Sequence, residues 1–484
     1  MTSQPKSLHP SQLAPDTSSC SLRMGSPQCL HNGFTADLLP PLLHPQQPEP
    51  CQTTYLEEKR SDNGGPYWTR PESRVWTVML LLGTCLLYCA RVTMPICSVS
   101  MSTQFNWDKK QSGMVLGSFF WGYCLTQIVG GHLSDKIGGE KVLLLSAFSW
   151  GLVTVATPVA AHISSMPLTL VTLFRFLMGL LQGVHFPALT SLLSQRVREN
   201  ERAFTCCTVS SGSQFGTLVI GGAGSLLLDW YGWESVFFFS GFVTLLWVYY
   251  MYKQHFSEKE YIISLEDITK NFSMSAQTHV PWKRLFRKGP VWAVIVGQLC
   301  IASTFFTLLS WLPTFFRETF PDSKGWVFNV IPWMLAIPAG VFSGVLSDHL
   351  IGLGFQTITV RKSMQVFGMG VSSFFVLCLG QTTSYRNAIV FASAAIGFQT
   401  FNHSGVSVNV QDLAPSCAGF LFGVANTGGA LLGVVWVNLS GYLIEATGSW
   451  TPVFNLVAVI NSIGLCVFLY FAEARRVDID LIHV

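Results

Sequence analysis

Two arginines lie inside long apolar segments of this sequence, and their position allows specific chemistry. Arg91 lies in the apolar stretch 75–97 and Arg175 in the stretch 167–194, and neither stretch contains an Asp or a Glu. An ionised side chain in an apolar interior costs several kcal/mol, so it is a candidate functional group by default. With no carboxylate to neutralise them, the two guanidinium groups predict a site for an anionic substrate.

A few polar residues extend this candidate site. Gln182 follows Arg175 by seven positions and therefore shares its helical face. Asn402 and His403 lie in the stretch 387–410, which is unusually polar for a membrane span. Both are candidate substrate contacts, although a histidine packed between helices explains His403 equally well. Each arginine also has a structural alternative, in which it reaches the membrane surface or caps backbone carbonyls.

The elements that hold these residues are predicted to be transmembrane helices. The chain is 49% hydrophobic and only 11% charged, whereas soluble proteins have about 25% charged residues. Runs of about 20 apolar residues indicate helices that cross a bilayer. Twelve such spans are expected, at 75–97, 113–134, 141–162, 167–194, 204–228, 233–252, 290–315, 326–347, 362–381, 387–410, 417–443 and 450–472.

A repeated motif divides these spans into two halves. Gly131 to Asp135 recurs 213 positions later as Gly344 to Asp348, with a Leu-Ser-Asp ending in both copies. A repeat of this kind indicates a transporter built from two related bundles. Glycine allows close helix contact, and the aspartate can pair with a basic loop or a helix N-terminus. We expect a conformational role for this motif; direct substrate contact is the alternative.

The fold class is therefore an all-α membrane protein with twelve transmembrane helices in two six-helix bundles. The expected parts are a disordered tail (1–74), an N-terminal bundle (75–252), a central loop (253–289), a C-terminal bundle (290–472) and a C-terminal tail (473–484). Lys and Arg gather in the central loop and in alternate loops, which places both termini in the cytosol. With this orientation, both arginines lie in the luminal half of the membrane.

Several function classes are excluded by absent patterns. The sequence has no phosphate-binding loop for ATP hydrolysis, no catalytic serine or zinc-hydrolase motif and no Cys/His metal spacing. We therefore expect no enzyme activity, no catalytic residue, no metal, no cofactor and no nucleic-acid partner.

Three stretches resemble a known family. Residues 119–131, 175–187 and 402–433 are similar to the vesicular and sodium-phosphate organic-anion branch of the major facilitator superfamily, and the match covers nearly all of 75–475. Residues 82–91 and 360–362 are most similar to its nucleotide-carrying members. Glutamate carriers of the branch have an acidic residue, a histidine and an arginine where this chain has Gln182, Leu116 and Ile301. These departures argue against glutamate as the substrate.

The resemblance implies import of ATP, ADP, GTP and UTP into secretory or lysosome-related vesicles, followed by exocytotic release. It further implies that the membrane potential of a vesicular proton pump drives transport and that chloride is an activator. We expect a monomer in the lipid bilayer, with Arg175 and Arg91 as the anion contacts. An organic-anion or phosphate symporter coupled to sodium or protons is one alternative, and an anion channel is the other.

Overall fold

The computed structural model describes residues 67–255, 285–321 and 325–477. All of them belong to one compact unit, Arg60–Val484. Most of the predicted tail (1–74) and of the central loop lies outside the described residues. Helix α2 begins at Arg70, five residues before the predicted start of the first span.

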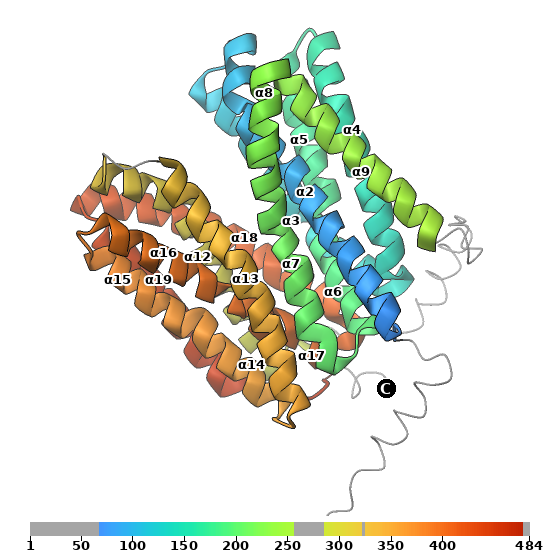
Figure 1. Cartoon of the computed structure of the whole chain (residues 1–484), viewed down its shortest axis with the longest axis vertical. Helices are drawn as coiled ribbons and strands as arrows, with labels where there is room; N and C mark the ends of the chain where they lie inside the picture. The colour runs from blue at the N-terminus through green and yellow to red at the C-terminus, as the bar shows by residue number, and fades with distance from the viewer. Residues whose placement is uncertain (1–66, 256–284, 322–324, 478–484) are drawn as a thin grey trace, which may run out of the picture. The chain divides into compact units, whose positions relative to one another are not determined.

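Helical rods make up the first half of this unit, and they lie side by side in Figure 1. Six rods correspond to the first six predicted spans: α2 (Arg70–Phe105), α3 (Lys109–Ile137), α4 (Gly139–Ile163), α5 (Pro167–Gly183) with α6 (His185–Arg196), α7 (Arg202–Val219) with η2 (Ile220–Gly224) and α8 (Ser225–Tyr231), and α9 (Trp233–His255).

The second half repeats this arrangement. Its rods are α12 (Gly289–Thr319), α13 (Gly325–Gly352), α14 (Thr357–Gln365) with η4 (Val366–Val371) and α15 (Ser372–Gln381), α16 (Tyr385–Gln399) with η5 (His403–Ser407) and α17 (Val408–Leu413), α18 (Ala418–Thr447), and α19 (Thr451–Phe471). The two predicted six-helix bundles are thus α2–α9 and α12–α19.

Ten helices of the described residues are long and apolar enough to cross a membrane. The other two predicted spans, α7–α8 and α16–α17, contain the π-helical turns η2 and η5, although α14–α15, one of the ten, also contains such a turn, η4. The turns η2 and η5 contain Gly221, Gly222, Gly224 and Gly405. Glycine weakens a regular helix, so a change in the hydrogen-bond pattern is tolerated at these points.

Local sequence determines where several helices begin and end. Asp108 caps α3 by accepting a hydrogen bond from the Gln111 backbone N–H at 2.6 Å. Asp is favoured at this position because its carboxylate satisfies a backbone donor that has no partner within the helix. Gly138 separates α3 from α4 with a φ of 97°, a backbone conformation that few other residues adopt.

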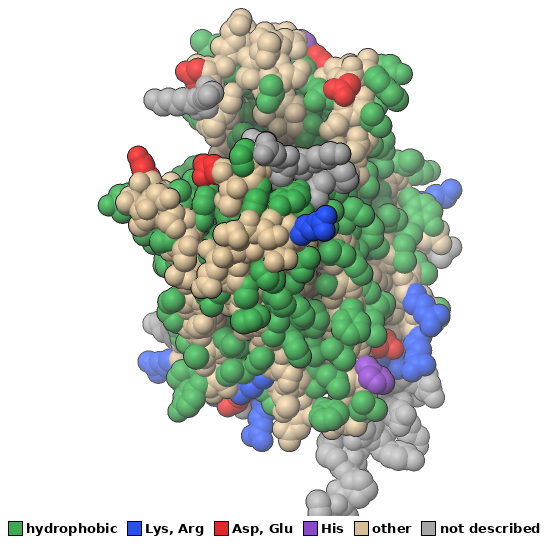
Figure 2. All heavy atoms as spheres, turned by 60° about the vertical axis from the view of Figure 1, so that its left-hand side comes forward, with side chains coloured by type: hydrophobic (Ala, Val, Ile, Leu, Met, Phe, Trp, Pro, Cys, Tyr) green, Lys and Arg blue, Asp and Glu red, His purple; other side chains and the backbone are tan. Residues whose placement is uncertain are grey.

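The outer surface of the bundles is apolar. Hydrophobic side chains cover the middle of the face seen in Figure 2, and most of its Lys and Arg side chains lie in the lower part of that view. Large exposed residues include Trp121, Ile163 and Tyr470, which are 70–81% exposed. Such a surface is stable in lipid, where apolar side chains need no cover.

Both ends of the described chain lie at the same end of the helices. Trp68 N–H donates to the Arg196 carbonyl, and Val477 N–H donates to the Leu413 carbonyl, both at 2.9 Å. These residues lie beside the two repeated motifs, so we call this end of the unit the Asp135 end. Its location in the cytosol stays a prediction from the distribution of basic residues.

Candidate functional site

Arg91 lies in the middle of α2 and is held by polar and aromatic neighbours. Its Nε donates to Gln182 Oε1 at 3.1 Å. Its guanidinium carbon lies 4.7 Å from the Tyr88 ring centroid and 4.9 Å from that of Tyr123. One turn later, Pro95 has no N–H to donate to the Arg91 carbonyl, so the helix loses one internal hydrogen bond at this point.

Arg175 lies in the middle of α5 and is 5% exposed. Its guanidinium carbon is 5.0 Å from the Phe119 ring centroid, and its Nε is buried without a hydrogen-bond partner. The Arg91 guanidinium carbon is 5.1 Å from the same ring. Both guanidinium groups therefore lie beside the Phe119 ring. The distance between their two carbon atoms cannot exceed the sum of these two distances.

Close packing of α3 against α5 brings this ring beside both arginines. A Cβ added to Gly179 would overlap the Phe119 carbonyl oxygen, and one added to Gly183 would lie 2.5 Å from the Tyr123 carbonyl oxygen. Small residues four positions apart allow helix backbones to approach in this way. The Gly-x-x-x-Gly pair of α5 thus determines how near Phe119 and Tyr123 come to the charges.

No carboxylate neutralises either guanidinium within the part of the chain that the structure describes. The ion pairs found there join Arg70 to Glu201, His162 to Glu234, Arg196 to Glu140, and both Arg202 and Arg361 to Asp412. An Nη2 of Arg91 is also buried without an acceptor. An unpaired buried charge is unfavourable, so an anion bound at this position would relieve the cost.

The structure groups only some of the predicted substrate contacts. Gln182 is fully buried beside Arg91 and also donates to the Leu87 carbonyl at 3.3 Å. Asn402 instead bonds to Gln365 in α14 at 2.9 Å. His403 follows it at the start of η5 and is half-buried. No interaction joins either residue to the arginines among the described residues, so their role as substrate contacts stays a prediction.

The two repeated motifs contact the opposite bundle. Asp135 accepts hydrogen bonds from the backbone N–H groups of Gly419 (3.0 Å) and Phe420 (2.8 Å), at the start of α18. Gly131 allows this approach, because an added Cβ would overlap the Gly419 carbonyl oxygen. Of the two partners predicted for the aspartate, the structure shows the helix N-terminus, where the dipole favours a carboxylate.

The second copy makes the corresponding contact. Asp348 accepts from the N–H groups of Ala203 (3.2 Å) and Phe204 (2.7 Å), at the start of α7. A Cβ added to Gly344 would come within 2.8 Å of the Ala203 carbonyl oxygen. Each bundle therefore caps a helix of the other with one carboxylate, and these contacts join the bundles at the Asp135 end.

A buried charge network beside Asp348 was not predicted from the sequence. Asp412 accepts from Arg202 at 2.6 Å and from Arg361 at 2.8 Å, and Arg361 is fully buried. Asp412 lies two residues beyond the predicted tenth span (387–410), and Arg361 lies just before the predicted ninth span (362–381). The helices α14 and α17 extend past these predicted bounds and bring Arg361 and Asp412 into the interface between the bundles. Arg202 belongs to the opposite bundle, so the network also joins the two bundles.

The aromatic residues around Arg91 were also not predicted as part of the candidate site. Tyr88 precedes Arg91 by one turn, and Phe119 and Tyr123 are spaced by four on α3, which is a helical spacing. That signal was present in the sequence. It did not stand out because the chain contains 36 Phe, 15 Trp and 12 Tyr.

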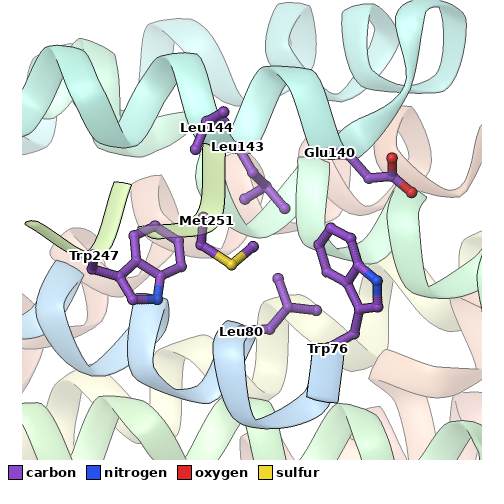
Figure 3. Close-up of a pocket in the computed structure, with 7 residues that line it drawn as sticks. All are labelled: Trp76, Leu80, Glu140, Leu143, Leu144, Trp247 and Met251. Atoms are coloured by element: carbon purple, nitrogen blue, oxygen red, sulfur yellow. The ribbon is translucent and has the colours of Figure 1, made fainter. Parts of the chain in front are cut away.

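A small cavity elsewhere in the N-terminal bundle has a different character. Trp76 and Leu80 of α2 line it together with Glu140, Leu143 and Leu144 of α4, and Trp247 and Met251 of α9 (Figure 3). Its volume of about 10 Å³ holds one water molecule at most. Drug-sized ligands need about 300–1,000 Å³, so this cavity is a packing gap and not a substrate site.

The comparisons with known proteins agree with this architecture. The sequence pattern described as Major Facilitator Superfamily matches residues 79–437. The chain belongs to this superfamily. Its members are transporters, so the chain is a membrane transporter and not an enzyme. Among solved structures, it is similar to the proton:xylose symporter XylE (TM-score 0.65, 13% identity, 83% of this chain and 97% of that one). It is also similar to FucP in the outward conformation (TM-score 0.61, 14% identity, 83% and 99%).

Curated relatives confirm the predicted branch of the superfamily. The chain is 64% identical to the human (Homo sapiens) voltage-gated purine nucleotide uniporter, over 88% of this chain and 98% of that protein. It is 32% identical to the chloroplastic sodium-dependent phosphate transport protein 1 of Arabidopsis thaliana, over 85% of this chain and 81% of that protein. Both relatives are named as transporters of anionic compounds.

Proposed function

We propose that this transporter carries nucleotides, with ATP as a principal substrate, and that the membrane potential drives the movement. The observation that carries the proposal is the pair Arg91 and Arg175, which share one aromatic neighbour and lack a carboxylate partner among the described residues. A polyphosphate supplies several negative charges and acceptor oxygens to such a pair. The high identity to a purine nucleotide uniporter supports the same substrate.

Voltage alone supplies enough free energy for this task. One elementary charge moved through 100 mV gains about 2.3 kcal/mol, so a nucleotide with four negative charges gains roughly 9 kcal/mol. That corresponds to a concentration ratio of more than about a million-fold. Stoichiometric coupling to protons is therefore unnecessary, and neither arginine needs a carboxylate to exchange protons with it.

The proposal includes a cellular setting. The protein resides in the membranes of secretory or synaptic-like vesicles and of lysosomes, with both termini in the cytosol. A vesicular proton pump makes the lumen positive and so draws the nucleotide inward. Chloride acts as an activator, the functional unit is a monomer, and the stored nucleotide serves purinergic signalling after exocytosis.

The test uses purified protein in proteoliposomes with an imposed potassium diffusion potential. Uptake of labelled ATP should saturate with ATP concentration and should rise as the interior becomes more positive. Arg175→Ala should abolish it, whereas Arg386→Ala, at an exposed arginine in the C-terminal bundle, should leave it unchanged. Normal ATP uptake by the Arg175→Ala protein would contradict the assignment.

An organic-anion or phosphate symporter is the second candidate. The 32% identity to a sodium-dependent phosphate transport protein favours it. Uptake that follows a sodium or proton gradient at zero potential would support this candidate against the uniporter. Unitary currents without saturation or competition would instead indicate an anion channel.

A further inference from the structure

One polar contact joins the two bundles next to the arginine pair, about two helical turns from the Asp135 end. Asn426 of α18 donates to the Tyr123 hydroxyl at 3.3 Å and to Gln127 Oε1 at 2.5 Å. Both acceptors belong to α3, in the opposite bundle. Asn426 lies seven residues beyond Gly419, which contacts Asp135, or about 10 Å farther along α18 at 1.5 Å per residue.

The residues that make this contact share one face of α3 with the candidate site. Phe119, Tyr123 and Gln127 are four positions apart, so each lies about 6 Å from the next along the helix. Phe119 lies against both guanidinium groups, and the centroid of the Tyr123 ring lies 4.9 Å from the guanidinium carbon of Arg91. The rings of Phe119 and Tyr123 also stack, with centroids 5.7 Å apart. A continuous row of contacts therefore runs from the arginines to Asn426.

The same row contains buried donors that have no partner. Gln127 is fully buried, and its Nε2 lacks an acceptor, as does one Nη2 of Arg91. Such atoms are rare in folded proteins, because each costs about 1–3 kcal/mol. An acceptor brought to this row would satisfy these two donors.

We propose that Asn426 is a positioning residue that couples occupancy of the arginine pair to contact between the bundles. A bound anion competes with the Tyr123 ring for Arg91. The ring then loses its cationic neighbour, and the hydroxyl changes its bond to Asn426. Since a ligand shifts a conformational equilibrium only through interactions that differ between the states, this row provides the required difference. The inference rests on the proposed anion-binding function of Arg91 and Arg175.

Two substitutions isolate the contact. Tyr123→Phe removes the hydroxyl and keeps the ring beside Arg91, and Asn426→Ala removes the amide. Asn438→Ala is the matched control, because Asn438 lies on the same helix but donates to Val434 of its own turn. A spectroscopic distance reporter between Ile163 and Tyr442, which are both exposed and lie in opposite bundles, follows the bundle separation.

The expected result separates binding from movement. In Tyr123→Phe and Asn426→Ala, ATP should bind within about threefold of the unmodified protein. Net uptake should fall by about 5- to 100-fold, the loss expected when buried hydrogen-bonding groups are left unpaired. The ATP-induced change in distance should disappear in both variants and persist in Asn438→Ala.

Two results would overturn the coupling. One is an unaltered distance change together with normal uptake in both variants. The other is a loss of ATP binding that equals the loss of uptake, which would make Asn426 a direct substrate contact. Failure of the proposed function is recognised separately, because the unmodified protein itself would then neither bind nor transport ATP.

Discussion

Replacing Arg175 with Met tests whether this arginine serves the substrate or the fold. Met has a similar length and no charge, so it fills the same space between α5 and Phe119. If Arg175 awaits an anion, the empty protein should lose nothing by the change, because the charge has no carboxylate partner among the described residues. If Arg175 holds the fold together, the same change should destabilise it.

The structure gives the expected magnitudes. Replacing a buried ion pair with apolar residues of similar volume is often neutral or stabilising by about 1–4 kcal/mol, and an unpaired buried charge has no ion-pair attraction to lose. The lost contact with the Phe119 ring, at 5.0 Å, offsets about 0.5–2 kcal/mol of that gain. The melting temperature of Arg175→Met should therefore stay constant or rise by a few degrees, at about 2–4 °C per kcal/mol for domains of 150–250 residues.

Binding should change in the opposite direction. Loss of one charged partner from a buried pair costs about 2–5 kcal/mol, which weakens ATP binding by about 30-fold to several thousand-fold. At 100 times its dissociation constant, ATP should stabilise the unmodified protein by about 2.7 kcal/mol. This stabilisation should vanish in Arg175→Met.

Thermal unfolding with and without ATP measures both effects. Asp412→Asn is the control, because Asp412 is buried and pairs with both Arg202 (2.6 Å) and Arg361 (2.8 Å). Leaving a buried charge without its partner costs about 3–5 kcal/mol, so this variant should melt earlier. The reasoning would be refuted if Arg175→Met melted as early as Asp412→Asn and still responded to ATP.

Two further changes test the packing and the charge network. Gly179→Ala should lower stability and uptake, because its Cβ would overlap the Phe119 carbonyl oxygen. Gly117→Ala is the control, because a Cβ there meets open space and should raise stability through helix propensity alone. The melting temperatures of the two variants check this difference. Asp412→Asn should cost at least about 3–5 kcal/mol, because it leaves both Arg202 and Arg361 without a carboxylate. A second change, Arg361→Met, removes one of these unpaired charges and should restore part of the loss in a double-mutant cycle.

The spans and the repeat were predictable because they depend on local properties. Hydropathy over about 20 residues is a property of each segment by itself. Among the described residues, ten of the twelve predicted spans correspond to helices that are long and apolar enough to cross a membrane. The π-helical turns η2 and η5 were not predicted, because they depend on a change of backbone hydrogen bonding that hydropathy does not report.

The candidate site was partly predictable for a related reason. Arg91 and Arg175 stand out in apolar segments whatever surrounds them, and Gln182 follows from helical spacing. Asn402 stands out equally by its polarity, yet its partner is Gln365 and no interaction with the arginines is found among the described residues. Polarity inside a span therefore identifies a buried group without identifying its partner.

The sequence by itself determined that this chain crosses a membrane as two related bundles and carries two arginines without a local counter-charge. Only the tertiary structure decided that Phe119 lies beside both of those arginines, and that Asp412 pairs with Arg202 and Arg361. The physical reason is sequence distance. Arg202 and Asp412 are separated by 210 positions, and no periodicity along one helix determines which residue of another bundle it will meet.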